Sequence, residues 1–375
     1  MAEPPVQRVL ARIDVGAVER NCARLAGELR GEAALCAVVK ADGYGHGAVA
    51  CSRAALAGGA TWLGVAAASE AGELRGAFPE VPILTMGALT PDELEVALRA
   101  GSDVTAWRPE FLALVAERAA ALGHPARVHV KYDTGMGRLG QRDPATVAAL
   151  VAQCAADERL ELVGLWTHFA TADEPDSRYF EEQLERFKEL AEPLKSEYPG
   201  LILHAANSAA TLRDPGSHFD MVRCGIAVYG LDPFHEGPDS RRLEPALELR
   251  SYVADVKRFR VGDSAGYGRR WRAPRDTSVG VLPIGYGDGV RRGLTNNGEV
   301  LVGGGRYPLV GTVSMDNVTI DLGPDTEVEP GEPAVLIGSQ DGERILAEDV
   351  ARRLDTINYE ITCGISARVP RIYGT

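Results

Sequence analysis

A lysine lies at the junction between an apolar run and a glycine-rich stretch, in the segment AVVKADGYGHG at residues 37–47. Apolar surroundings favour the neutral amine over the ammonium, so Lys40 could act there as a base or form a Schiff base. The glycines let the backbone approach a ligand closely, and Tyr44 offers a hydroxyl. By itself, the segment also fits a solvated lysine at a strand end, followed by an ordinary turn.

Other polar residues follow apolar runs further along the chain. They are Lys131 with Arg138, His168, Asn207 with Ser208, and Arg223 with Gly225 and Ile226. Simpler explanations exist for some: ion pairs with Asp133 and Asp143 for Lys131 and Arg138, a helix cap for Ser208, and an ordinary strand-end position for His168. Arg223 is harder to explain in this way, because a buried guanidinium needs a partner.

The elements that would position these residues alternate between residues 34 and 228. Short apolar runs predict strands at 34–39, 62–65, 83–86, 103–105, 127–132, 160–166, 201–206 and 221–228. Amphipathic stretches predict helices at 48–56, 69–75, 91–100, 109–122, 144–155 and 178–194. This α/β alternation favours an N-terminal TIM (β/α)8 barrel over a doubly wound sheet. The polar residues would then converge at the rim formed by the carboxyl ends of the strands.

The pattern changes beyond Pro233, where period-two alternation predicts a C-terminal mostly-β domain. We place the boundary in the Pro-, Gly- and Asp-rich segment 232–243, which gives a barrel domain at 1–240 and a β domain at 241–375. A strand at 9–13 is left over from the barrel, so residues 1–13 are available to pair with the β domain. Asn297-Gly298 predicts a hairpin turn before 299–302.

Charge and composition point to a small-molecule substrate. The 375 residues include 53 acidic and 40 basic side chains, and the formal charge of -13 would repel nucleic acids and anionic membranes. We see no secretory leader and no apolar run long enough to span a bilayer. The six cysteines lack the spacing of a metal site or a disulfide framework, which predicts reduced thiols in a cytoplasmic protein without a metal.

The predicted rim combines a phosphate site with a lysine. Ser208 and the Gly225-Ile226 pair follow the last strands, where TIM barrels commonly bind phosphate. A phosphate there, together with a desolvated Lys40, indicates pyridoxal phosphate, whose aldehyde takes a lysine as a Schiff base. Arg223 could then address the pyridine nitrogen.

At these residues the chain resembles the alanine racemase family of fold type III pyridoxal-phosphate enzymes, nearly from end to end. The segment at 38–47 is similar to the cofactor-attachment signature of that family. Supporting segments lie at 131–138, 166–170, 207–208, 223–226, 266–268, 285–289, 314–316, 359–361 and 368–371. Ser314 stands where many relatives have a cysteine, which affects only details of the substrate entrance.

The resemblance implies a two-base enzyme that interconverts L-alanine and D-alanine and supplies D-alanine for bacterial peptidoglycan. Lys40 would hold the cofactor and exchange the α-proton of D-alanine, and Tyr267 would exchange that of L-alanine. Arg223 would donate to the pyridine nitrogen without surrendering its proton. His168 would bridge Arg223 and Tyr267, so that nearby positive charge lowers the pKa of the phenol.

Further roles come with the resemblance. The implied cofactor-binding residues are Lys40, Tyr44, Asn207, Ser208, Arg223, Gly225, Ile226 and Tyr359. The implied substrate-binding residues are Arg138, Met315, Lys131 and Tyr286. Lys131 matches a position that is carbamylated in many relatives. In the family Tyr267 reaches the active site of a second subunit, which implies a homodimer with shared sites.

Other functions fit part of this pattern. A serine or broad-specificity amino acid racemase needs only small pocket changes near Tyr286, Ser314 and Met315. A non-catalytic pyridoxal-phosphate-binding protein would resemble the N-terminal half alone, and the β domain with Tyr267 argues against it. A fold type III decarboxylase would present an acid to the ring nitrogen, where we expect Arg223.

Overall fold

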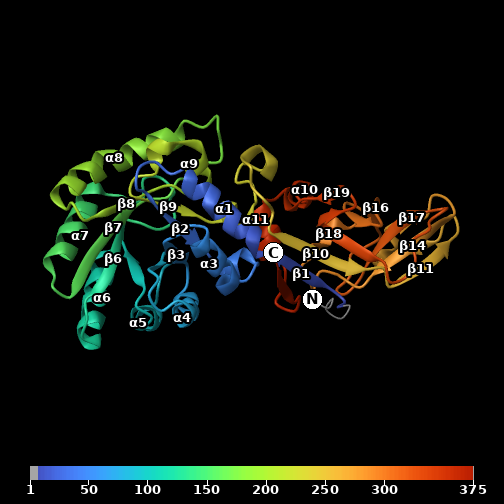
Figure 1. Cartoon of the computed structure of the whole chain (residues 1–375), viewed down its shortest axis with the longest axis horizontal. Coiled ribbons are helices and arrows are strands. Elements are labelled where there is room, and N and C mark those ends of the chain that lie inside the picture. Colours follow the sequence, from blue (N-terminus) through green and yellow to red (C-terminus); the bar gives the residue numbers. More distant parts are fainter. Residues whose placement is uncertain (1–6, 375) are drawn as a thin grey trace. The chain divides into compact units, whose positions relative to one another are not determined.

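The computed structural model describes residues 7–374 and divides into two compact units (Figure 1). One unit comprises residues 18–234, and the other combines residues 7–17 with residues 235–374. Within the described residues, no helix combines the length and the apolar character needed to cross a membrane.

Parallel strands form the centre of the unit at 18–234. Its sheet has eight strands in the order β8-β7-β6-β5-β4-β3-β2-β9. Their bounds are β2 Ala34–Val38, β3 Trp62–Val65, β4 Ile83–Thr85, β5 Asp103–Ala106, β6 Ala126–Lys131, β7 Leu160–Trp166, β8 Ile202–His204 and β9 Met221–Cys224. The amide of Arg223 donates to the carbonyl of Ala206 (2.9 Å), which links β9 to the end of β8 and nearly closes the ring. The predicted TIM-like barrel is confirmed.

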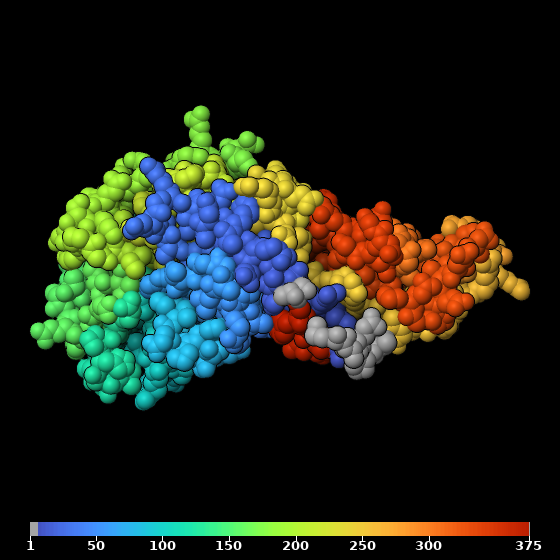
Figure 2. Space-filling model, viewed as in Figure 1, coloured from blue at the N-terminus to red at the C-terminus, as the bar shows by residue number. Residues whose placement is uncertain are grey.

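Helices lie outside these strands, as Figure 1 shows. They are α1 Val15–Gly27, α3 Ala48–Ala57, α4 Ala68–Ala77, α5 Pro91–Arg99, α6 Pro109–Leu122, α7 Pro144–Ala156, α8 Tyr179–Glu197 and α9 Ser208–Arg213. Proline occupies the first turn of α5, α6 and α7, where its missing N–H costs nothing. Figure 2 shows the outer surface of the unit, on which blue, cyan and green segments that follow one another in the sequence lie side by side.

The last barrel strand is shorter than predicted. β9 ends at Cys224, and the 3-10 helix η2 (Ile226–Tyr229) replaces the predicted continuation to residue 228. The turn forms because the amides of Gly225 and Ala227 point at the hydroxyl of Ser208, and because the Tyr229 hydroxyl donates to the Val38 carbonyl (3.1 Å). An apolar run that is buried in a tight turn has the same composition as a strand.

The second unit is built on a ten-stranded sheet in the order β11-β14-β17-β16-β15-β18-β10-β1-β20, with β19 beside β18. The bounds are β1 Leu10–Asp14, β10 Leu247–Tyr252, β11 Asp255–Phe259, β14 Thr277–Leu282, β15 Glu299–Val302, β16 Gly305–Val310, β17 Val318–Gly323, β18 Pro333–Gln340, β19 Glu343–Ile345 and β20 Arg371–Gly374. β12 Ser264–Ala265 and β13 Trp271–Arg272 form a separate ribbon, and two helices, α10 Ala347–Arg353 and α11 Asn358–Cys363, complete the unit. β1, the strand left over from the barrel, pairs with β10 and β20.

The prediction of a hairpin turn at Asn297-Gly298 is wrong. The turn between β15 and β16 is Gly303-Gly304, whose φ angles are 54° and 75°. Two successive left-handed residues match the twist of a two-residue hairpin, and a pair of glycines adopts them without strain. Gly298 instead accepts a hydrogen bond from the amide of Leu309 (2.8 Å), at the start of the β15–β16 pair.

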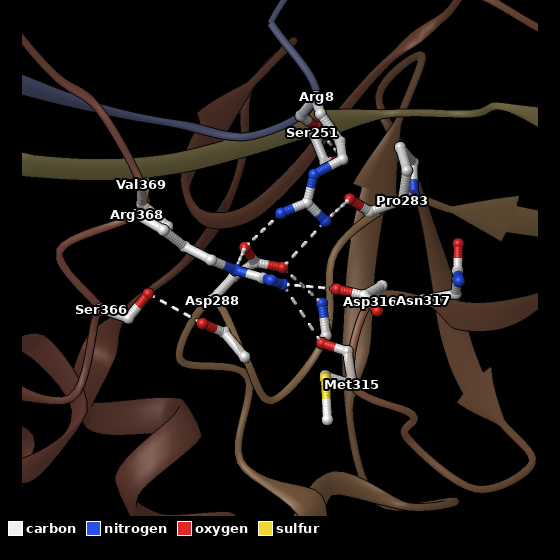
Figure 3. Close-up of polar contacts among 12 residues, drawn as sticks. Arg8, Ser251, Pro283, Asp288, Met315, Asp316, Asn317, Ser366, Arg368 and Val369 are labelled. Carbon is white, nitrogen blue, oxygen red and sulfur yellow. Dashed lines mark hydrogen bonds and ion pairs between the residues drawn. The ribbon is translucent and has the colours of Figure 1, made fainter.

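A buried aspartate ties together distant segments of the second unit (Figure 3). The carboxylate of Asp288 accepts hydrogen bonds from Arg8 (2.5 Å), from Arg368 (2.7 Å) and from the amide of Gly285 (2.9 Å). Arg368 also pairs with Asp316 (2.7 Å). This cluster, Arg8–Asp288–Arg368, fixes the loop at 285–288 against the loop at 314–316.

We predict that Asp288→Asn lowers the free energy of unfolding by about 2 kcal/mol at pH 7. This is less than for a fully buried pair, because both guanidinium groups are partly exposed. Burial raises the pKa of Asp288, but hydrogen bonds from Arg368 and Arg8 outweigh it and hold the pKa below its ordinary value. The stabilisation is therefore present above about pH 4 and lost as the pH falls further.

Urea unfolding of the wild type and the variant measures this difference. The control is Asp239→Asn, which removes an ion pair with Arg344 in which both side chains are exposed. An equal loss of stability in the two variants, or a loss at Asp288 that does not shrink as the pH falls below about 4, would contradict the prediction.

Candidate active site

Lys40 follows β2, at the carboxyl end of the barrel. The two residues before it, Val38 and Val39, are buried, whereas Lys40 is half-buried. Its ammonium nitrogen lies 5.9 Å from the centre of the Tyr44 ring. The first apolar run therefore delivers the lysine to the rim, as predicted from the junction.

The chain forms a left-handed turn directly after Lys40. Ala41, Asp42, Gly43 and Tyr44 have φ angles of 52°, 52°, 60° and 54°. The sequence predicts a tight turn with close backbone approach at the glycines, but it does not reveal the left-handed conformation of Ala41, Asp42 and Tyr44. Each non-glycine residue in such a conformation costs about 1–2 kcal/mol. Strain of this kind persists where the surroundings fix it, which is common at functional sites.

Hydrogen bonds from neighbouring elements hold the left-handed turn. A carboxylate oxygen of Glu70, on α4, accepts from the amide of Ala41 (2.6 Å). The carboxylate of Asp42 accepts from the amide of Ala48 (2.9 Å), at the start of α3. The imidazole Nδ1 of buried His46 lies 3.0 Å from the carbonyl of Tyr44. The turn is thus fixed on both sides, and it directs Tyr44 toward the last barrel strand.

A group of hydrogen-bonding atoms meets at Gly225. The hydroxyl of Ser208 accepts from the amides of Gly225 (3.0 Å) and Ala227 (3.4 Å). A Cβ atom at position 225 would lie only 2.3 Å from the Tyr44 hydroxyl oxygen, so a larger residue would displace that hydroxyl. The capping alternative for Ser208 is wrong, because Asn207 caps α9 by accepting from the amide of Ala210 (3.0 Å). Two hydroxyls beside backbone amides are suited to a phosphate group.

Arg223 is buried inside the barrel with neutral partners. It donates to Nδ1 of His204 (3.0 Å) and to the carbonyls of Thr167 (2.8 Å) and Ala205 (3.1 Å). Among residues 7–374, no carboxylate forms an ion pair with it. Burial lowers the pKa of Arg223 to about 10, which still leaves the guanidinium charged at neutral pH.

Lys131 is a second buried cation at the same rim. Its ammonium nitrogen lies 4.0 Å from the centre of the Trp166 ring, and the guanidinium carbon of Arg223 lies 4.5 Å from that centre. Burial lowers the pKa of Lys131 to about 7, and the charges of Arg223 and Arg138 act in the same direction. A partly neutral amine at pH 7 is the form that carbamylation needs, and that modification stays a prediction.

The simple alternative of ion pairs for Lys131 and Arg138 is wrong. The carboxylate of Asp133 accepts from the amide of Gly137 (3.0 Å) and shapes the exposed loop that carries Arg138. Asp143 caps α7 by accepting from the amide of Thr146 (3.0 Å). In the described part of the chain, neither carboxylate is paired with Lys131 or Arg138.

His168 is half-buried and touches Arg223. The guanidinium of Arg223 lies 3.4 Å from Nδ1 of His168. Burial, followed by the charge of Arg223, holds the pKa of His168 well below its ordinary value. His168 is therefore neutral, so it adds no positive charge of its own to the site. Since arginine only donates, Nδ1 accepts and Nε2 carries the proton.

The remaining predicted residues belong to the second unit. Tyr267, Met315 and Tyr286 are 76%, 53% and 44% exposed. Tyr267 begins the 3-10 helix η4 (Tyr267–Arg269), and its carbonyl accepts from the Thr312 hydroxyl (2.6 Å). Tyr359 is half-buried on α11. Contacts between these residues and the barrel residues stay predictions.

Sequence reasoning missed several residues that shape the rim. They are Glu70, His129, Trp166, Thr167 and His204. A usable signal was present for the two histidines, because each lies in a predicted apolar strand where a polar side chain needs a partner. Their partners lie on other strands, so the sequence does not reveal the pairing.

These residues fit pyridoxal phosphate. Lys40, Arg138 and Arg223 all add positive charge around Lys131, and an anionic ligand would balance this charge. The hydroxyls and amides at Gly225 suit its phosphate, and Lys40 suits its aldehyde. A charged donor without an acid partner, Arg223, suits its ring nitrogen. Together with the barrel, this donor set is typical of the fold type III class of pyridoxal-phosphate enzymes.

Family models agree with this class. The model described as "Alanine racemase, N-terminal domain" matches residues 13–233, and "Alanine racemase, C-terminal domain" matches residues 246–373. The chain belongs to the alanine racemase family, whose members depend on pyridoxal phosphate.

Individual relatives are similar over nearly their full length. Alanine racemase of Symbiobacterium thermophilum is 43% identical over 365 residues, which cover 97% of this chain and 96% of the relative. Alanine racemase 1 of Bacillus subtilis is 40% identical over 97% of this chain and 92% of its own. The crystal structure of alanine racemase from Streptomyces lavendulae superposes with a TM-score of 0.93 at 40% identity, covering 100% of this chain and 98% of the other.

We predict that Gly225→Ala weakens binding of pyridoxal phosphate by about tenfold or more. The added methyl group would displace the Tyr44 hydroxyl, and a hydrogen bond to a charged group contributes about 1.5–3 kcal/mol. Fluorescence titration of the cofactor-free protein measures the affinity. The control is Gly200→Ala, where an added Cβ meets nothing within 4 Å. Equal affinity in the two variants would contradict this account of the phosphate site.

Proposed function

We propose that this protein interconverts L-alanine and D-alanine with pyridoxal phosphate by a two-base mechanism. The observation that carries the proposal is Arg223, a buried guanidinium with neutral partners at the rim that also bears Lys40. When bound, pyridoxal phosphate supplies an electron-withdrawing ring that stabilises negative charge at the substrate Cα. Racemization then requires proton carriers on the two opposite faces of that carbon.

Lys40 and Tyr267 are the proposed proton carriers. The Nζ atom of Lys40 holds the cofactor in the resting enzyme and moves the α-proton of D-alanine. The Oη atom of Tyr267 moves the α-proton of L-alanine on the other face. Neither base needs extreme strength, because the cofactor ring shares the negative charge.

Arg223 and His168 tune this chemistry. Arg223 donates to the ring nitrogen and keeps its own proton, since its pKa of about 10 lies well above neutral pH. By leaving the ring nitrogen unprotonated, Arg223 would make the cofactor ring a weaker electron acceptor and would restrain side reactions such as transamination. The Nε2–H of neutral His168 is available to donate to the phenol oxygen of Tyr267.

The other predicted residues bind the phosphate and the substrate. Tyr44, Asn207, Ser208, Gly225, Ile226 and Tyr359 are proposed for the cofactor, and Arg138, Lys131, Met315 and Tyr286 for the substrate. The hydroxyls and amides gathered at Gly225 support the first group. The excess of positive charge around Lys131 supports the second, because the substrate carries a carboxylate.

We also propose a homodimer with shared active sites. Tyr267 is 76% exposed, and Met315 and Tyr286 are exposed near it, on loops joined by the hydrogen bond from the Tyr286 amide to the Ser314 carbonyl (3.0 Å). A phenol that moves a proton in catalysis must be shielded from bulk water. A second copy of the chain would cover Tyr267 in this way. The free thiols of all six cysteines, all within residues 7–374, support a reducing, cytoplasmic location.

Turnover of several amino acids tests the reaction and its specificity. The purified enzyme is incubated with L-alanine, L-serine or L-lysine, and the D-enantiomer is measured by chiral chromatography. We expect alanine to react with the highest kcat/KM. A higher kcat/KM for serine or lysine would mean that alanine is not the preferred substrate. Release of carbon dioxide without racemization would overturn the proposal.

We predict that Tyr267→Phe lowers racemization by about 10²–10⁴-fold with pyridoxal phosphate still bound, because the second proton carrier is lost. Lys40→Ala should be inactive as well. Refolding the two variants together should restore about one quarter of wild-type activity, since half of the dimers would be mixed and each would have one intact site. Absence of recovery in mixed dimers of confirmed composition would contradict shared sites.

A further inference from the structure

A chain of buried hydrogen bonds leads away from Arg223, through the interior of the barrel. Arg223 on β9 contacts Nδ1 of His204 on β8 at 3.0 Å. Nε2 of His204 lies 2.8 Å from Nδ1 of His129 on β6, and Nε2 of His129 lies 3.1 Å from a carboxylate oxygen of Asp103 on β5. The four side chains are at most 3% exposed. TIM-barrel interiors are mostly filled by branched apolar residues, so this polar layer needs an explanation.

The chemistry of arginine determines which atom donates and which accepts in each of these hydrogen bonds. A guanidinium can only donate, so Nδ1 of His204 must accept and its Nε2 must carry the proton. That proton is donated to Nδ1 of His129, whose Nε2–H is then donated to Asp103. Burial and the charge of Arg223 hold the pKa of His204 well below its ordinary value, which agrees with a neutral ring. One tautomer of each histidine satisfies every contact.

The surrounding barrel is shaped to hold these rings. Gly164 makes room for the contact between the histidines, because a Cβ there would lie 2.3 Å from Nδ1 of His129. The Trp166 ring stacks on His204 at 5.6 Å with an angle of 9° between the planes. The Trp62 and His129 rings form a T-shaped pair, with centres 5.8 Å apart and planes at 84°. This packing opposes the ring rotation that would exchange the two nitrogens.

Asp103 anchors the far end of the chain. Its second oxygen accepts from Nε of Arg127 (2.8 Å), and Arg127 also pairs with Glu161 near the surface. Both carboxylate oxygens therefore face donors. A carboxylate is the only side chain that accepts on both sides in this geometry, whereas an asparagine would turn a donor toward one of them.

We propose that Asp103, His129 and His204, here called the histidine chain, are positioning residues that fix Arg223 by imposing the accepting tautomer on His204. The proposal rests on the proposed function only in that Arg223 faces the cofactor ring. The carboxylate of Asp103, at one end of the histidine chain, stabilises the guanidinium of Arg223 at the other end through the two neutral imidazole rings. Arg223 thus keeps its charge and its place without an acid beside it.

The first test is direct detection of the tautomers. The wild-type holoenzyme, labelled with ¹⁵N in its histidine rings, is examined by NMR, and signals are assigned with His204→Gln and His129→Gln. We expect both rings to be neutral with the proton on Nε2. A protonated ring, or a proton on Nδ1 of either residue, would overturn the proposal. This readout does not depend on alanine turnover, so it is separate from the test of the proposed function.

The second test changes Asp103, the carboxylate at the end of the histidine chain. Asp103→Asn presents an amide donor either to His129 or to Arg127. In the first case both histidines must change tautomer, and His204 then presents N–H to Arg223. We expect kcat to fall by about tenfold or more, with KM for alanine and cofactor content nearly unchanged. The histidine signals should show the altered tautomers.

Arg127→Gln is the matched control, because it removes the ion pair of Asp103 and leaves the histidine chain intact. It should keep wild-type kcat. When Asp103→Asn and Arg127→Gln are combined, the introduced glutamine can accept from the amide of the introduced asparagine. The oxygen of that asparagine can then face His129 again, so part of kcat should return.

Two outcomes would overturn the proposal: an equal loss of kcat in Arg127→Gln, or wild-type kcat in Asp103→Asn. If Asp103→Asn fails to fold, His129→Leu fills the barrel with an apolar side chain, removes the acceptor of the His204 Nε2–H and should give the same loss of kcat.

Discussion

The site depends on keeping a guanidinium charged inside the barrel without a carboxylate beside it. A buried ion usually needs an oppositely charged partner, and its removal from water is expensive. Arg223 instead uses two backbone carbonyls, the His204 ring and the face of Trp166. Its charge is therefore not cancelled locally, and an anionic ligand at the rim would balance it. Burial, and after it the charge of Arg223, holds the pKa of His168 well below its ordinary value and lowers the pKa of Lys131.

Local backbone geometry brings the other groups to this cation. The left-handed turn after Lys40 is strained, but carboxylates of Glu70 and Asp42 bind its amides and fix it. The turn places the Tyr44 hydroxyl so close to residue 225 that any Cβ there would displace it. In the second unit, the Arg8–Asp288–Arg368 cluster holds the loops that present Tyr286 and Met315. Rigid supports of this kind let a site keep groups at fixed positions.

Much of the barrel could be predicted from the sequence, because buried parallel strands and amphipathic helices leave different hydrophobic periods. Strand ends also located Lys40, Lys131 and Arg223 at one rim. The left-handed turn could not be predicted, since its strain is offset by groups far along the chain such as Glu70. The strand ending at Cys224 was overextended because a buried 3-10 turn is equally apolar. The pairing of His129 with His204 joins residues 75 positions apart, and no local pattern reveals it.

The protonation of the cofactor ring tests the central claim most directly. The enzyme is loaded with pyridoxal phosphate labelled with ¹⁵N in its ring, and the nitrogen signal is recorded by NMR near pH 8. Because Arg223 donates and keeps its proton, the account predicts the chemical shift of an unprotonated, hydrogen-bonded ring nitrogen. The chemical shift of a protonated pyridinium would contradict the account, because it would mean that the ring nitrogen receives a proton from an acid and not only a hydrogen bond from Arg223.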